Sequence, residues 1–221
     1  MNTLGIIPAK QKSSRLKNKN ILKINKKRLI EYSFISAIKS KVLNNIIVTT
    51  DSKLISDLAK KNKIDVRKRP KKLSKVNSNI NCVILDVLRY FYNIKNFYPD
   101  LIVLMEPTSP LRSSQTIVDV VNFFKNNKSV KSILPVTKKN NLIAVKKKKI
   151  IFFNNKNILD SRKRESYLEI NSLIWGVRVN YFLKKNKVFD ENSTPFFTNY
   201  NEVLDINNVN DFRKLKKIIK K

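Results

Sequence analysis

A basic loop follows the first apolar run of the chain and is the first place where the sequence could bind a ligand. Residues 4–8 are apolar, and residues 7–20 read IPAKQKSSRLKNKN, in which five cations are mixed with hydroxyl and amide side chains. Cations, hydroxyls and backbone N–H groups beyond a strand end are the groups that bind a triphosphate. The glycines of a Walker A loop or a dinucleotide-binding fingerprint are missing. Taken alone, the composition of the loop favours a solvated basic turn in a lysine-rich protein.

A second candidate segment, EPTSPLR at residues 106–112, follows the continuously apolar run LIVLM at 101–105. Two prolines stiffen the backbone around two hydroxyls, and the segment ends at Arg112. This composition predicts a rigid loop that faces a ligand. The alternative is the start of a helix with Ser113 or Ser114 as its N-cap, and both can hold at once.

A third candidate segment, LDIN at residues 204–207, carries an acid and an amide two residues apart. On a strand, Asp205 and Asn207 would lie on the same face, and their oxygens would suit a Mg²⁺ ion that also bridges phosphates. The alternative is that Asp205 ends a strand and that Asn207 or Asn208 caps the last helix.

Short apolar runs alternate with longer amphipathic stretches along most of the chain, which predicts how these segments are positioned. Expected strands are 4–8, 46–50, 64–66, 101–105, 132–136 and 203–206, and expected helices are 28–39, 53–61, 80–92, 116–125 and 209–219. This alternation predicts an α/β fold with three layers, in which a mostly parallel sheet is flanked by helices. Ligands bind such sheets at the carboxyl ends of the strands, where the three candidate segments fall.

The alternation of short apolar runs with longer amphipathic stretches stops between residues 136 and 181. Short strand-like pieces at 142–145, 150–153 and 173–179 are separated by charged turns. We therefore expect one domain over residues 1–221 that carries a small antiparallel excursion at 137–181, either a substrate lid or a dimer arm.

The net charge of +31 could favour polyanions such as nucleic acid or phosphorylated substrates. The cations are spread over the whole chain without interleaved aromatic residues, so we favour a compositional origin and expect no specific nucleic-acid partner. No apolar run is long enough to cross a bilayer, and the first residues do not resemble a signal peptide. The single cysteine, Cys82, rules out an internal disulfide. We expect a cytoplasmic protein with no membrane partner.

Taken in order, these segments resemble the acylneuraminate cytidylyltransferase family, the CMP-sialic acid synthetases and their relatives for other nine-carbon acidic sugars. The family loop IPARGGSKRLPGKN stands here as residues 7–20, and its VSTD, RPxxLS and QPTSPLR segments stand at 48–51, 69–74 and 106–112. Its RENGAIY segment is recognisable as EINSLIW at 169–175, and its DIDTxxDF segment stands at 205–212. The resemblance covers nearly the whole chain in the right order.

The resemblance implies a role for each matched residue. The residues implied for CTP are Pro8, Ala9, Lys10, Ser13, Arg15, Lys19, Asn20 and Arg69. The residues implied for the sugar are Glu106, Pro107, Thr108, Ser109, Arg112, Asn171 and Trp175, with Arg162 or Arg164 meeting its carboxylate. Asp205 and Asn207 are the implied ligands of Mg²⁺, and Lys10, Lys19 and Asp205 are the implied catalytic residues.

The implied reaction transfers CMP from CTP to the anomeric hydroxyl of a nonulosonic acid and releases pyrophosphate. It depends on positioning and charge neutralisation, so the absence of histidine is no objection. The family is dimeric, and the excursion would reach toward the partner subunit.

The chain departs from the family pattern at four places in the implied site. Lys10 replaces an arginine, Gln11 and Lys12 replace two glycines, Glu106 replaces a glutamine, and Asn207 replaces an aspartate. Glu106 would repel a carboxylate or phosphate unless it is protonated or bound to metal. The alternatives are an active cytidylyltransferase, a degenerate member with weak or no catalysis, and a nucleotidyltransferase for another sugar.

Overall fold

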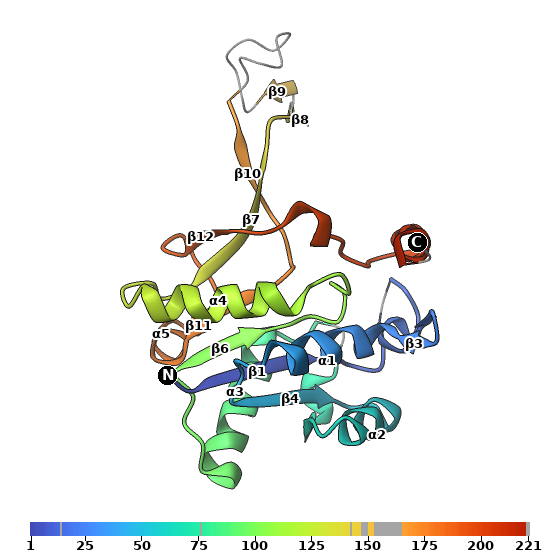
Figure 1. Ribbon diagram of the computed structural model, residues 1–221, viewed down its shortest axis with the longest axis vertical. Coiled ribbons are helices and arrows are strands. Elements are labelled where there is room, and N and C mark those ends of the chain that lie inside the picture. The colour runs from blue at the N-terminus through green and yellow to red at the C-terminus, as the bar shows by residue number, and fades with distance from the viewer. Residues whose placement is uncertain (14, 76, 142, 147–149, 153–164, 220–221) are drawn as a thin grey trace.

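The computed structural model describes residues 1–13, 15–75, 77–141, 143–146, 150–152 and 165–219. Its central sheet is made of β1 (Thr3–Pro8), β4 (Asn45–Thr50), β5 (Asp65–Lys68), β6 (Leu101–Leu104) and β11 (Trp175–Arg178). The strand order is β11-β6-β1-β4-β5, and every pairing is parallel except that of β11 with β6 (Figure 1). The predicted α/β fold with a mostly parallel sheet is confirmed.

Helices cover both faces of this sheet and complete the three layers. They are α1 (Leu29–Ser40), α2 (Lys53–Lys61), α3 (Ile80–Tyr90, continued by a π-helical turn, Phe91–Lys95), α4 (Ser114–Asn126) and α5 (Val179–Lys185). A further helix, α6 (Val209–Ile219), packs separately against the start of α1. One apolar core joins α1, α2 and α4 to one face of the sheet, and a second joins α3 and α5 to the other. Alternate residues of β1 divide between the two, with Ile7 in the first core and Leu4 and Ile6 in the second.

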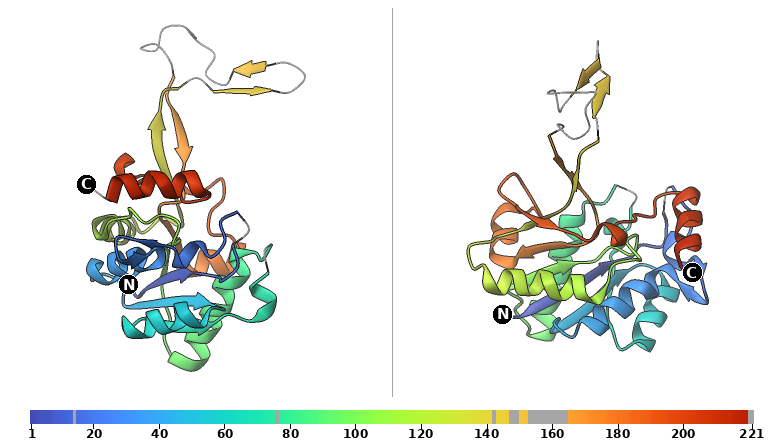
Figure 2. Two further views of the ribbon diagram at one scale, coloured as in Figure 1. Left: turned by 90° about the vertical axis from the view of Figure 1, so that its right-hand side faces the viewer. Right: turned by 45° about the horizontal axis from the view of Figure 1, so that its top comes forward.

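A second, smaller sheet carries the antiparallel part of the chain away from the body (Figures 1 and 2). Its strand β7 (Ile133–Lys139) pairs antiparallel with β10 (Tyr167–Ile170) and parallel with β12 (Thr194–Phe197). Beyond β7, the strands β8 (Ala144–Lys146) and β9 (Ile150–Phe152) form a two-stranded ribbon. The predicted strand at 173–179 exists as β11, but it pairs in the central sheet and not in this excursion.

The predicted strand at residues 203–206 is wrong. This stretch is irregular, and it crosses the carboxyl edge of the central sheet instead of adding to it. The backbone N–H of Ile206 donates to the carbonyl of Thr108 (2.8 Å), so the segment is fixed to the loop that follows β6. Ile206 is itself buried in a third apolar cluster, which includes Leu215 of α6. The alternation of apolar residues at 203–206 thus reflects this docking and not a β-ladder.

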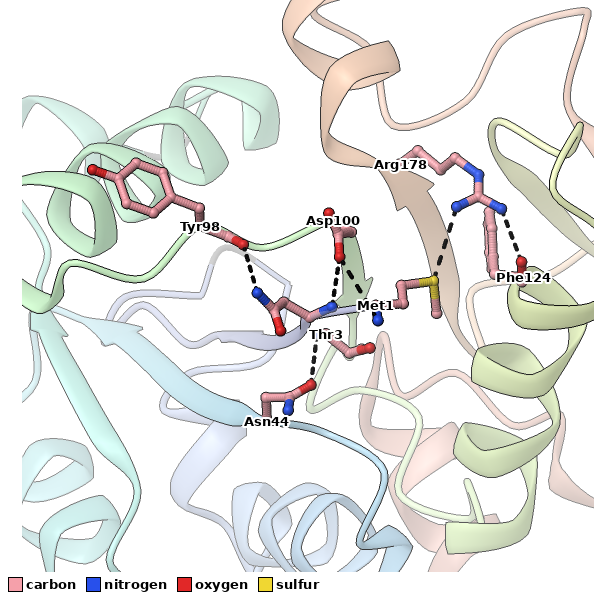
Figure 3. A network of polar contacts seen from close by, with 8 residues as sticks. Met1, Thr3, Asn44, Tyr98, Asp100, Phe124 and Arg178 are labelled. Carbon is pink, nitrogen blue, oxygen red and sulfur yellow. Dashed lines mark hydrogen bonds and ion pairs between the residues drawn. The ribbon is translucent and has the colours of Figure 1, made fainter.

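The opposite, amino-terminal edge of the sheet is closed by short polar contacts (Figure 3). The backbone N–H of Asn2 donates to the Asp100 carboxylate (2.6 Å), which fixes the start of β1 beside β6. The Arg178 guanidinium at the end of β11 donates to the carbonyl of Phe124 on α4 (2.8 Å). The loops at the carboxyl edge are therefore carried by strands that are fixed at their other end. No helix in the described ranges combines the length and the apolar character needed to span a membrane.

Candidate active site

A pocket of about 310 Å³ lies at the carboxyl ends of β1 and β6. It is the size of a small ligand site. The structure brings seven of the eight residues predicted for the nucleotide to its wall, namely Pro8, Lys10, Ser13, Arg15, Lys19, Asn20 and Arg69. The eighth, Ala9, is fully buried beside them. Segments far apart in the sequence thus form one basic pocket.

The backbone of the basic loop accepts the residues that replace the family's glycines. Neither Gln11 nor Lys12 has a positive φ, and both side chains are exposed. The Gln11 N–H donates to the Asp51 carboxylate (2.7 Å), and the Asn20 amide donates to the carbonyl of Lys10 (3.1 Å). The replacements at residues 11 and 12 therefore impose no backbone strain. Asn18, which aligns with the third glycine of the family loop, has a φ of 56°, a conformation that asparagine tolerates better than most residues.

Arg69 lies buried at the edge of the pocket, at 7% exposure. Its guanidinium donates to the hydroxyl of Thr49 (3.2 Å) and to the carbonyl of the same residue (2.9 Å), at the end of β4. Burial lowers the pKa of Arg69 to about 10, and the nearby Asp51 carboxylate opposes this shift. Arg69 therefore stays a cation at neutral pH. Its two hydrogen bonds to Thr49 hold it at the end of β4.

Lys19 joins the basic loop to the carboxyl-terminal segment. Its Nζ donates to the carbonyl of Ile206 (2.7 Å). Burial lowers the pKa of Lys19, and the carboxylate of Asp205 acts against that shift. Lys19 therefore places a partly desolvated cation between the two segments.

A second pocket of about 440 Å³ lies between the end of β10 and the carboxyl-terminal segment. Among the residues predicted for the sugar, Ser109, Asn171 and Trp175 line it, together with Asp205. Glu106, Pro107 and Thr108 instead line the first pocket. The loop 106–109 thus separates the two cavities, with its two ends facing different sides.

Arg112 was predicted to bind the sugar, but it lines neither of the two pockets. It is 3% exposed, and its guanidinium donates to the carbonyls of Glu106 (3.3 Å) and Leu173 (2.7 Å) and to the hydroxyl of Ser33 (2.8 Å). Burial lowers its pKa to about 10. Arg112 therefore holds the loop rigid from inside. Arg162 and Arg164, the other predicted sugar ligands with charge, lie outside the described residues.

The segment 106–112 leads into α4, as in the alternative interpretation of a helix start with Ser113 or Ser114 as its N-cap. Ser113 is the N-cap, and its hydroxyl accepts from the backbone N–H of Thr116 (3.1 Å). The segment 106–112 is thus both a rigid loop and the lead into a helix.

Asp205 and Asn207 meet although they are not on a strand. The Asn207 amide donates to Asp205 Oδ2 (2.6 Å), while Asp205 Oδ1 is buried without a hydrogen-bond partner. A buried, unpartnered carboxylate oxygen at a pocket wall fits a hard cation such as Mg²⁺. The described residues contain no cluster of three or more acidic, histidine or cysteine side chains, so protein ligands alone would not saturate such an ion.

Glu106 is partly buried and lines the first pocket together with Lys19. Burial raises the pKa of its carboxyl group, and the charge of Asp205 raises it further, while Lys19 and Arg112 oppose both effects. The site therefore holds two carboxylates that affect each other electrostatically.

Four residues of the first pocket were not predicted from the sequence, namely Leu16, Ser78, Ile80 and Val83. The last three lie at or just before the start of α3, which reads as an ordinary amphipathic helix, so nothing in its composition marked it as a pocket wall.

The fold and the two pockets define a nucleotidyltransferase of the nucleotide-sugar type, with a basic loop after the first strand and carboxylates at the opposite wall. The chain matches the cytidylyltransferase family over residues 4–218 and belongs to it.

Two relatives illustrate the membership, and one solved structure shares the fold. The chain is 35% identical to a CMP-N,N'-diacetyllegionaminic acid synthase of Legionella pneumophila over 141 residues, which span 63% of this chain and 60% of that protein. It is 30% identical to the synthase of the same name from Campylobacter jejuni, over 98% of this chain and 94% of that one. A solved CMP:2-keto-3-deoxy-manno-octonic acid synthetase complexed with CTP has the same fold, with a TM-score of 0.74, 11% identity, and coverage of 100% and 99%.

Proposed function

We propose that this protein transfers CMP from CTP to the anomeric hydroxyl of a nonulosonic acid, with release of pyrophosphate. The observation that carries the proposal is the pair of adjoining pockets. One is basic and gathers the residues predicted for CTP, and the other lies at the Asp205 carboxylate. The two relatives above are named for N,N'-diacetyllegionaminic acid, which makes a diacetylated nonulosonic acid the first acceptor to test.

The first pocket would bind CTP through charge. Lys10, Arg15 and Lys19 reach its wall from the basic loop, and Arg69 reaches it from the end of β5. Charge-assisted hydrogen bonds from such cations neutralise phosphate oxygens and orient the α-phosphorus. Ile80 and Val83 add apolar surface from α3.

The second pocket would bind the acceptor. Asn171 is held by a hydrogen bond from its amide to the Thr198 hydroxyl (2.9 Å), and Trp175 is stacked on Phe189 with ring centroids 4.7 Å apart. Apolar walls with a few fixed polar groups suit a sugar that carries N-acyl substituents. The acceptor hydroxyl would then enter past Asp205, close to the phosphates.

Mg²⁺ would be held at the Asp205 carboxylate. When bound, it neutralises charge on the phosphate oxygens and acts as a Lewis acid. Lys19 would add a fixed positive charge beside the same oxygens, because its Nζ is held by the carbonyl of Ile206. We further propose that the enzyme acts in the cytoplasm as a homodimer, with the excursion at the interface.

The test is a transfer assay. Purified protein with CTP, Mg²⁺ and a panel of nonulosonic acids should release pyrophosphate and form a CMP-sugar detectable by mass spectrometry. Omission of the sugar is the control for simple CTP hydrolysis. A folded protein that forms no CMP-sugar with any acid of the panel contradicts the proposal.

A thermal-shift comparison tests the alternative function, a nucleotidyltransferase that uses another nucleotide than CTP. CTP with Mg²⁺ should raise the unfolding temperature more than UTP or GTP at equal concentration, because only a preferred ligand stabilises strongly by mass action. Equal shifts for the three nucleotides would favour a nucleotidyltransferase for another sugar.

A further inference from the structure

We propose that Glu106 and Asp205 together form the carboxylate pair that binds the divalent cation in this chain, and that Asn207 positions Asp205 and is not a ligand. This assignment rests on the proposed function, in which a metal ion assists nucleotidyl transfer. It replaces the pair Asp205 and Asn207 that the sequence predicted.

The contact between Asn207 and Asp205 gives the two side chains different roles in this structure. An amide group that lies 2.6 Å from a carboxylate oxygen must present its nitrogen, because two oxygen acceptors would repel each other. The amide oxygen of Asn207 is then turned away from Asp205. Asp205 keeps one free oxygen, Oδ1, which is buried and has no hydrogen-bond partner. Asn207 thus fixes one oxygen of Asp205 and leaves the other for a cation.

The loop that carries Glu106 and the segment that carries Asp205 are joined by a backbone hydrogen bond, and Lys19 contacts the second segment from the pocket that Glu106 lines. The N–H of Ile206 donates to the carbonyl of Thr108 (2.8 Å), so the residue after Asp205 is tied to the loop that begins with Glu106. Lys19 also binds the carbonyl of Ile206 (2.7 Å). Glu106 lines the first pocket and Asp205 lines the second, so a cation between them would face both substrates.

The cations nearby do not pair with these carboxylates. The Arg112 guanidinium is committed to two carbonyls and one hydroxyl, and Lys19 is committed to a carbonyl. Within the described part of the chain, neither Glu106 nor Asp205 forms an ion pair. Lys19 and Arg112 act on the Glu106 carboxylate through their charge and not through a direct contact. The carboxylate oxygens are therefore not used in ion pairs, and oxygen donors of this kind suit Mg²⁺ or Mn²⁺.

The departures of this chain from the family pattern support the same assignment of the metal ligands. The family pattern has glutamine and aspartate where this chain has Glu106 and Asn207, so one carboxylate is lost and one is gained. The number of carboxylates in the set stays at two. A Mg²⁺ ion held by one or two carboxylates and by substrate phosphates tolerates such an exchange.

The test is a swap of the two positions, with Mn²⁺ as the probe. Binding of Mn²⁺ to the purified protein with CTP is measured by electron paramagnetic resonance, against a blank of CTP alone. Glu106→Gln should weaken Mn²⁺ binding by about tenfold or more, and the double variant Glu106→Gln/Asn207→Asp should restore it to within about threefold of wild type. Asp57→Asn, which removes an exposed carboxylate of α2, is the matched control and should bind as wild type.

Unfolding temperature is the second measurement. Mn²⁺ should raise it for the wild type and the double variant but not for Glu106→Gln, and all three should be folded in EDTA. Unchanged Mn²⁺ binding by Glu106→Gln would overturn the assignment, and so would a double variant that stays as weak as the single one. Loss of transfer activity with intact Mn²⁺ behaviour would instead count against the proposed function, so the two failures can be told apart.

Discussion

The Lys19 side chain belongs to the basic loop and contacts the carboxyl-terminal segment. Its Nζ is bound to the carbonyl of Ile206, while its stem lines the first pocket. Lys17, two residues earlier in the same loop, is exposed and lines neither pocket. The loop therefore contains cations of two kinds, those that face the pocket and those that face solvent.

Replacement of Lys19 by alanine should weaken CTP binding by about tenfold to a hundredfold, because a charge-assisted hydrogen bond to phosphate contributes about 1.5–3 kcal/mol. Isothermal titration calorimetry measures the change. Lys17→Ala is the matched control and should change the dissociation constant little. Equal losses in both variants would mean that total loop charge matters and not position.

Residue types predicted most of the site, and internal bonding explains the rest. The basic loop, Arg69 and Asp205 could be found because cations and acids stood at expected strand ends. Arg112 was misassigned because its hydrogen bonds to buried carbonyls cannot be read from a sequence. The positive charge of an arginine after a rigid loop suits a ligand and an internal brace equally well.

At the scale of elements, continuous apolar runs predicted the central strands, because these strands are covered on both faces. The helix α5 was missed because it follows β11 without a break, with Arg178 at its N-cap. The strand β12 was missed because Pro195 interrupts its pattern. Residues 203–206 were wrongly predicted as a strand because most of their side chains are apolar. In the structure these apolar side chains pack against α1 and α6.

A hydrogen bond joins α5 to the loop that follows it, and its contribution to the stability of the fold should depend on pH. The Tyr181 hydroxyl donates to Asp190 Oδ2 (2.6 Å), and this hydrogen bond lowers the pKa of the Asp190 carboxyl group. A folded-state pKa below the unfolded value gives stability that is present above the unfolded pKa and lost as the pH falls through the folded one.

We therefore expect Tyr181→Phe to lower the free energy of unfolding at pH 7 and to lose this difference in acid, below the usual aspartate value of 3.8. Urea unfolding at several pH values measures it. Asp190→Asn should show the same trend, and a difference that persists unchanged in strong acid would mean that packing of the ring is responsible.

At the scale of the whole molecule, the excursion exposes apolar side chains on β10, and one of them, Ile170, also lines the second pocket. Leu168 and Ile170 point to one side of β10 and are 43% and 54% exposed. Exposed apolar side chains on a projecting strand are typical of an interface between subunits.

We expect Leu168→Asp/Ile170→Asp to convert a dimer into a monomer of 25.8 kDa, measured by size-exclusion chromatography with light scattering. Leu183→Asp, which charges an equally exposed leucine on α5, is the control and should leave the mass unchanged. A wild type that is already monomeric at micromolar concentration would contradict the proposed dimer.

The docking of residues 205–206 at the edge of the sheet has a consequence for the order in which the protein matures. Lys19 of the basic loop is synthesised 187 residues before its partner Ile206. The amide of Asn25 binds the carbonyl of Ile219 (2.9 Å), so α6 also packs back on the first residues (Figure 2). A nascent chain can form the sheet before it can form the site, and the ability to bind CTP with a metal ion should appear only once residues 205–206 have left the ribosome.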